Sequence, residues 1–350
     1  MKKVITLGCI IILLFELTGL SQTHVYGVRV KGSKLWGYAD LEGEVFIEPA
    51  FKLGFEFSEN GRALVVPKKG FELIDLQGKV TDVEVEKLKV ITDPWSGIPE
   101  GYTDGLLCIK QNNKWGALDS DGKLVIPAKY DNLSIFSGGF AIAGIDQQFI
   151  VVNKSGQETP IRDPALKAVK HFSEDLALVK GQEGKWGYIN TTGEFVISPQ
   201  YSSAGYFSGG LAWARDQNGN IGFIDKEGNW AINPRFSAAK DFDAVSGMAL
   251  ITFNDVKHYV NKEGTLSTFE QTSKLYPFSD GLAIARWNGK IGFINNNMEW
   301  VIQPKYTAAR AFHNGYATVE LNSRWGVIDA EGNVIVEPKF MDVRDVKLLH

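Results

Sequence analysis

Short apolar runs separated by turn residues alternate along almost the whole chain. Residues 176–179 and 186–189 are two such runs, with Gly, Asp or Asn close to their ends. Runs of four to six apolar, β-branched or aromatic residues with these boundaries are typical of strands, and the short loops between them are typical of hairpins. Apart from the first 20 residues, no stretch has the 3.6-residue period of a helix. This pattern predicts an all-β chain.

One phrase returns nine times along the chain, at a step of about 35 residues. Its clearest copy is KWGYINTTG at residues 185–193, and the third residue serves as the anchor of each copy. Asp or Asn follows each anchor by three residues and Gly follows it by six, with Met298 the single exception. A fixed period of this length indicates small similar units that bury their apolar faces against one another. The anchors are Gly37, Glu72, Gly116, Ile150, Gly187, Gly222, His258, Gly292 and Gly326.

Each unit is predicted to contain three short strands. The recurring Asp or Asn and the Gly after it predict a tight turn before the third strand, because Asx side chains bond their own backbone and Gly tolerates positive φ. In six units a proline follows the third strand and, since it lacks a donor, is expected to end the pairing there. These prolines are Pro49, Pro127, Pro199, Pro234, Pro304 and Pro338.

We therefore expect residues 22–350 to form a tandem array of about nine three-stranded β-meander units. Such units can form an open β-superhelix, which is a solenoid, or a closed β-propeller. Propellers typically have four to eight blades with four strands each. Nine smaller units favour the open β-superhelix, and the closed β-propeller is the alternative.

Two sets of recurring aromatic residues predict the core of the repeats. A Phe, usually followed by Ser, stands about half a repeat after the anchor, and a Trp directly precedes the anchor in four units. Where Ile221 and Ile291 replace that Trp, another Trp appears nine residues later. We interpret the two Trp positions as filling one shared layer of constant volume. The predicted core residues are Trp36, Trp115, Trp186, Trp230, Trp300, Trp325, Phe57, Phe136, Phe172, Phe207, Phe278 and Phe312.

Three further tryptophans lie outside the recurring positions and are candidates for ligand binding. Trp95 belongs to the insertion that lengthens one step to 44 residues, and loops inserted into a rigid scaffold often carry binding residues. Trp213 lies in a predicted strand, and Trp287 precedes an Asn-Gly turn. Such rings stack on sugar rings or anchor a protein partner. The alternative is that they pack against a neighbouring unit.

Residues 1–21 have the pattern of a secretory signal peptide. Two lysines precede an apolar run of about a dozen residues, and small or polar residues follow it. We expect cleavage near Ser21 or Gln22, and hence export to the periplasm, the cell surface or the medium. Glu16 interrupts the run well short of the roughly 20 residues that span a membrane, so the mature chain is expected to have no transmembrane segment. A lipoprotein is not expected, because Cys9 lies inside the apolar run rather than after it.

Charge and motif content exclude several classes of function. Without the leader, 35 basic residues face 40 acidic ones, a net charge of −5, with no basic block of five or more. Nucleic acid is therefore not expected as a partner. The row of Asp and Asn is interpreted as turn caps, since each unit supplies one ligand where calcium needs six to eight. No metal, cofactor or catalytic residue is predicted, because the five histidines recur at no fixed position and the usual catalytic motifs are not found in the sequence.

The phrases Lys-Trp-Gly-Tyr-Ile-Asx-x-x-Gly, Val-Ile-x-Pro-x-Tyr and Phe-Ser-x-Gly-Leu-Ala resemble the WG-repeat family of mostly bacterial proteins, over about residues 25–340. The resemblance implies no catalytic activity and suggests binding or scaffolding. The expected function is a non-catalytic exported module that binds a protein or glycan partner. A glycan-processing enzyme whose carboxylates meet only in space and a purely structural spacer are the alternatives. The signature is lost at Glu72, Ile150 and His258, where a shorter or looser hairpin is expected.

Overall fold

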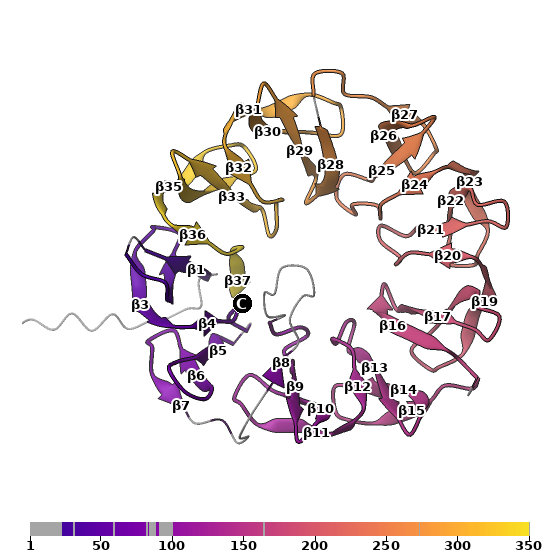
Figure 1. Ribbon diagram of the computed structural model, residues 1–350, viewed down its shortest axis with the longest axis horizontal. Coiled ribbons are helices and arrows are strands. Elements are labelled where there is room, and N and C mark those ends of the chain that lie inside the picture. The colour runs from indigo at the N-terminus through magenta and orange to yellow at the C-terminus, as the bar shows by residue number, and fades with distance from the viewer. Residues whose placement is uncertain are drawn as a thin grey trace, which may run out of the picture.

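The computed structural model describes residues 23–30, 32–58, 60–81, 83, 89–90, 101–163, 165–272 and 274–349. In this part of the chain, nine antiparallel sheets follow one another around a central channel (Figure 1). The molecule is therefore a closed nine-bladed β-propeller, and the favoured prediction of an open β-superhelix was wrong. We number the blades 1–9 in the order of their anchors.

Blades 1–4 contain the following strands, in order from the central channel to the rim. Blade 1 contains β36 (Asp342–Val343), β37 (Lys347–Leu349), β1 (Thr23–Arg29), β2 (Trp36–Asp40) and β3 (Val45–Phe51). Blade 2 contains β4 (Leu53–Gly54), β5 (Arg62–Val66), β6 (Glu72–Asp75) and β7 (Val80–Thr81). Blade 3 contains β8 (Lys89–Val90), β9 (Leu107–Gln111), β10 (Lys114–Leu118) and β11 (Leu124–Tyr130). Blade 4 contains β12 (Asn132–Leu133), β13 (Phe140–Ile145), β14 (Gln148–Asn153) and β15 (Glu158–Pro160).

The remaining five blades complete the ring in the same direction. Blade 5 contains β16 (Ala168–Ser173), β17 (Leu176–Lys180), β18 (Trp186–Ile189) and β19 (Phe195–Tyr201). Blade 6 contains β20 (Ser203–Ala204), β21 (Ala212–Arg215), β22 (Ile221–Ile224) and β23 (Trp230–Phe236). Blade 7 contains β24 (Ala238–Ala239), β25 (Met248–Phe253), β26 (Val256–Asn261) and β27 (Leu266–Ser267). Blade 8 contains β28 (Lys274–Ser279), β29 (Leu282–Trp287), β30 (Lys290–Ile294) and β31 (Trp300–Tyr306). Blade 9 contains β32 (Ala308–Ala309), β33 (Tyr316–Leu321), β34 (Arg324–Asp329) and β35 (Val334–Phe340).

The ring closes because the two ends of the chain share one sheet. Strands β36 and β37, near the C-terminus, both pair antiparallel with β1, near the N-terminus. Arg29 and Arg310 both hydrogen-bond Asp342 at this seam, and the backbone amide of Met341 donates to the Arg29 carbonyl at 2.8 Å. In the closed ring every blade packs against a neighbour on both faces. An open stack would instead leave its two end units with an exposed face.

Every sheet has more strands than the three predicted: eight sheets have four strands and that of blade 1 has five. The additional pairing lies nearest the channel and comes from the segment that links one unit to the next. In seven blades a named piece of it spans only two residues, such as β20 and β32. Such short pieces have no pattern of their own in the sequence, so the prediction of three-stranded units was wrong.

The anchor glycine is required because the outer strand bulges directly over it. In blade 5, Trp186 pairs with Tyr201 and Tyr188 pairs with Ile197, so two steps on β18 oppose four on β19. A Cβ on Gly187 would lie 2.7 Å from the Pro199 nitrogen and closer still to the Ile197 carbonyl oxygen. The proline therefore lies inside the outer strand, at the bulge, and the prediction that it ends the pairing was wrong. A bulge is where a strand proline is tolerated, since no ladder hydrogen bond is lost.

Blades without the anchor glycine have shorter outer strands. Glu72, Ile150 and His258 hold the anchor position in blades 2, 4 and 7. Their outer strands β7, β15 and β27 have two, three and two residues, where the glycine-bearing blades have seven. The Cβ at the anchor leaves no room for the bulge, so pairing stops before it. The shorter hairpins predicted for these units are confirmed.

The turn prediction is also confirmed. Asp119, which is typical of the set, accepts backbone hydrogen bonds from Asp121 at 3.0 Å and Lys123 at 2.9 Å through one carboxylate oxygen. Gly122 follows with a φ of 78°. Met298, the exception to the Gly pattern, adopts a φ of 62° in the same turn. The recurring Asx and Gly residues therefore serve the turn.

The apolar core lies between blades, where the third strand of one blade meets the first strand of the next. Phe207 of blade 6 packs edge to face on Tyr188 of blade 5, with ring centroids 4.8 Å apart. The Tyr188 hydroxyl donates to the Gly205 carbonyl at 2.8 Å, and the Ser173 hydroxyl donates to the Phe207 carbonyl at 2.6 Å. Blades 6 and 7 and blades 8 and 9 share the serine bond and the aromatic contact. The Phe-Ser phrase thus joins neighbouring blades.

Candidate functional site

A hollow of about 390 Å³ opens along the channel wall at blades 5, 6 and 7. Its floor is the first strand of blade 6, where three small residues, Ser203, Ala204 and Gly205, follow one another. Trp186 of blade 5 and Trp213 of blade 6 also line it. A volume of this size lies within the usual range of small-ligand sites.

Trp213 reaches the hollow because Gly205 makes room for it. The residue lies on β21, and Leu178 and Leu250 hold the same position in blades 5 and 7, each paired with a third-strand aromatic residue. A Cβ on Gly205 would collide with the indole Nε1 and neighbouring ring atoms of Trp213. The large ring on the second strand and the glycine on the first strand therefore fit together, and the half-buried indole reaches the hollow.

Trp213 is further held by a hydrogen bond to Asp241 of blade 7. Desolvation of the Asp241 carboxyl raises its pKa, although the Trp213 bond and the charge of Lys240 act in the opposite direction. The bond joins blade 6 to blade 7 across the hollow. It also fixes the orientation of the indole, since a single donor on the ring has one acceptor to reach.

A stacked aromatic pair borders the same hollow. His171 of blade 5 lies against Tyr206 of blade 6, with ring centroids 4.2 Å apart, and its Nδ1 is 3.2 Å from the tyrosine hydroxyl oxygen. Burial, with a contribution from the Lys170 charge, lowers the pKa of His171. The imidazole is therefore neutral at pH 7, and the pair extends the aromatic lining that Trp186 and Trp213 begin.

The polar rim of the hollow carries more positive than negative charge. Lys170 and Lys240 are both exposed; Lys170 lies on the first strand of blade 5, and Lys240 directly follows the first strand of blade 7. Among the described residues that line the hollow, Asp241 is the carboxylate. One carboxylate does not supply the pair that the usual glycoside hydrolysis requires.

Comparison with known families identifies the repeat. The family model described as WG containing repeat matches residues 36–69, 115–147, 151–186, 186–220, 221–256, 291–325 and 325–347. The chain belongs to the WG-repeat family. Parts of blades 3 and 7 fall outside these matches. This agrees with the insertion before β9 of blade 3 and with the loss of the signature at His258 of blade 7.

One solved structure shows the same type of fold as this WG-repeat protein. The crystal structure of the eukaryotic initiation factor is similar, with a TM-score of 0.59 over 94% of this chain and 98% of that chain, at 11% identity. The crystal structure of BamB from Moraxella catarrhalis matches with a TM-score of 0.40 over 77% of this chain and 88% of that chain, at 10% identity. At such identities the likeness concerns the fold alone. No curated protein sequence matches the chain significantly.

Trp287 is not among the described residues that line the hollow. Trp287 is 43% exposed at the hairpin between β29 and β30, next to Asn288 and Gly289, which both have positive φ. Trp95 lies outside the described residues, as do residues 1–21, for which a signal peptide is predicted. Of the two candidates that the structure describes, Trp213 lines a cavity and Trp287 does not.

The predicted core residues fall into two groups in the structure. The six phenylalanines are all buried, whereas the six tryptophans are half-buried. Cations cover several of the signature rings, for example Lys180 at 5.4 Å from the centroid of Trp186. The interpretation that both Trp positions fill one layer was wrong. Ile221 packs between blades 6 and 7, but Trp230 packs against the cluster between blades 5 and 6.

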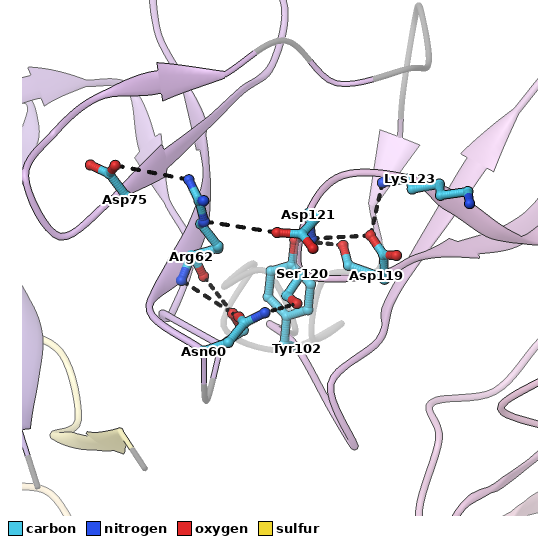
Figure 2. Close-up of polar contacts among 9 residues, drawn as sticks. Asn60, Arg62, Asp75, Tyr102, Asp119, Ser120, Asp121 and Lys123 are labelled. Atoms are coloured by element: carbon cyan, nitrogen blue, oxygen red, sulfur yellow. Dashed lines mark hydrogen bonds and ion pairs between the residues drawn. The ribbon is translucent and has the colours of Figure 1, made fainter. Parts of the chain in front are cut away.

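A polar network at blades 2 and 3 is a joint rather than a site (Figure 2). Arg62 of blade 2 lies 3.9 Å from Asp75 of its own blade and 3.9 Å from Asp121 of blade 3. Asn60 hydrogen-bonds Ser120 in the same turn. Asp121 is 72% exposed, so these contacts add little stability individually. They connect the turns of two neighbouring blades.

Sequence reasoning missed most of the hollow. His171, Tyr206 and Asp241 each directly precede the recurring Phe of their blade, but the residue type at this position varies among the repeats, as it does at the position of Gly205. The available signal was the pairing of an unusual Trp on the second strand with a Gly eight residues earlier. Within the described part of the chain, no group of three His, Cys, Asp or Glu side chains is placed to hold a metal ion. No helix among these residues is long and apolar enough to cross a bilayer.

Proposed function

We propose that this WG-repeat protein is an exported, non-catalytic binding module, and that its glycan or protein partner occupies the hollow between blades 5 and 7. The hollow is the observation that supports the proposal: about 390 Å³, with a floor of small residues and walls formed by Trp186 and Trp213. The ring supplies a rigid support, because blades 5 to 9 are joined in succession by buried aromatic contacts and hydrogen bonds. Rigid aromatic anchors in a concave surface give affinity at a low entropic cost.

The test compares two tryptophan substitutions that the protein's own repeats already tolerate. Trp213→Leu introduces the residue that blades 5 and 7 have at that position, Leu178 and Leu250. Trp115→Ile, the control, introduces at the signature position of blade 3 the residue that blade 6 has as Ile221. Both variants should fold. A glycan array and an affinity capture with the mature chain supply the partners, whose affinities are then measured by calorimetry.

The expected result is that Trp213→Leu weakens binding at least about tenfold, because loss of an aromatic anchor costs more than about 1.4 kcal/mol. Trp115→Ile should leave the affinity unchanged. Equal affinities for the Trp213→Leu variant and the wild-type protein would refute the placement of the site. Fractionation of cells that produce the full chain tests export, and retention of the uncleaved chain in the cytoplasm would refute that part.

A further inference from the structure

The hollow contains the groups that recognise a sugar ring. Trp186, Tyr206 and Trp213 line it, and the faces of pyranose rings are apolar enough to pack on aromatic rings. Ser203 and Asp241 add a hydroxyl and a carboxyl at the same cavity, and sugar hydroxyls both donate and accept hydrogen bonds. The small residues of the floor leave the space between Trp186 and Trp213 open. A sugar ring, which has an apolar face and hydroxyl groups, suits this combination of aromatic and polar groups.

The charges in the hollow indicate which class of sugar it would bind. Two cations, Lys170 and Lys240, stand against the single carboxyl of Asp241 among the lining residues that the structure describes. Asp241 accepts a hydrogen bond from Trp213, and its surroundings disfavour its ionised form. Lys170 forms no ion pair with any described residue. A net positive hollow favours an anionic ligand over a neutral one.

We propose that the hollow binds an acidic sugar, one that carries a carboxylate, with its ring against Trp213 and its carboxylate between Lys170 and Lys240. This inference rests on the proposed binding function and specifies the ligand for the same site. The lysines come from blades 5 and 7, on either side of blade 6, and both line the same hollow as Gly205 and Tyr206. A protein partner would not need this arrangement of rings and cations.

The experiment uses pairs of glycans that differ in the carboxylate. An array carries uronate-terminated and sialylated oligosaccharides beside their neutral parents, such as sialyllactose beside lactose. Affinities of the best pair are measured by calorimetry at low and high salt for the mature protein. The variants are Lys170→Gln with Lys240→Gln, Trp213→Leu, and the control Lys305→Gln, an exposed lysine on the rim strand β31.

The wild-type protein should bind the acidic member about tenfold more tightly than its neutral parent, as one charge-assisted contact of about 1.4 kcal/mol would give. Added salt should reduce this preference. The double lysine variant should bind both members equally, Trp213→Leu should lose both, and Lys305→Gln should behave as wild type.

Three other outcomes would overturn the inference. Binding of neutral parents as tightly as of acidic members would overturn the acidic-sugar assignment and leave the binding module intact. Binding of a protein partner in a Trp213-dependent manner, with no glycan bound, would have the same consequence. If Trp213→Leu retains full binding of every partner, both the inference and the proposed function fail.

Discussion

The substitution Gly187→Ala should shorten the outer strand of blade 5 without unfolding the rest of the ring. The added Cβ would lie 2.7 Å from the Pro199 nitrogen and 2.8 Å from the Ser198 carbonyl carbon, and closer still to the Ile197 oxygen. All three atoms belong to the backbone, so no side-chain rotation relieves the contact. The outer strand β19 must move outward, and the pairing of Trp186 with Tyr201 beyond the bulge is lost.

The expected cost is about 2–4 kcal/mol. Overpacking contributes about 1–3 kcal/mol, and two lost backbone hydrogen bonds add about 0.5–1.5 kcal/mol each. Alanine offsets about 0.5–1 kcal/mol through the lower entropy of its unfolded chain. The blades with Glu72, Ile150 and His258 show the expected end state, a sheet whose outer strand has two or three residues.

Urea unfolding gives the change in free energy, and amide hydrogen exchange shows where the change occurs. Amides of β19 should exchange faster in the variant, while those of β16 and β17 should be unaffected. Gly184→Ala is the control, since Gly184 has a φ of 78° but its nearest neighbour is Lys180 Cε at 3.7 Å. That change should cost only about 1–2 kcal/mol, from the left-handed backbone, and should not expose β19. A loss below about 0.5 kcal/mol for Gly187→Ala, or unchanged protection of β19, would refute the reasoning.

Four further predictions concern the seam, the core and the surface. Deletion of residues 342–350 removes three buried aliphatic side chains worth about 1.5–3 kcal/mol each, so a thermal melt should show a large loss of stability and scattering should show an opened ring. Burial raises the pKa of Asp342, but bonds from two arginines outweigh it and lower the pKa, so its stabilising effect is present above about pH 4 and is lost as the pH falls through the folded value. The stability gap between wild type and Asp342→Asn should therefore narrow on acidification, and a gap that widens would contradict the assignment. Phe312→Ala should cost about 3–5 kcal/mol in denaturant because the ring is fully buried, whereas Trp287→Ala should change stability by less than about 0.5 kcal/mol.

The sequence predicted the repeat correctly because the turns are local. Asx and Gly at fixed offsets specify one turn, and that turn recurs in every unit. Nine units and the all-β class followed from the same local signal. The anchor glycine was recognised as recurrent, but its reason, a bulge that crosses it, required the register of β18 and β19.

Closure and the site depended on contacts that the local pattern does not contain. The pairing of β1 with β37 joins residues more than 300 positions apart, and two-residue strands such as β20 give no periodic signal. The hollow combines side chains from three blades, so no single repeat contains it. Trp213 stood out from the residues at equivalent positions in other repeats, but the role of Gly205 was not apparent in the sequence.

The shared sheet of blade 1 has a consequence for biosynthesis. While a nascent chain lacks β36 and β37, β1 is an unprotected edge whose backbone amides and carbonyls await their partners. The first strand of the propeller to be synthesised is thus the last to be completed, and the synthesis of β36 and β37 determines when that edge is covered. During this interval a second copy can supply the missing strands, so the concentration of unfinished chains controls the yield of correctly closed monomers.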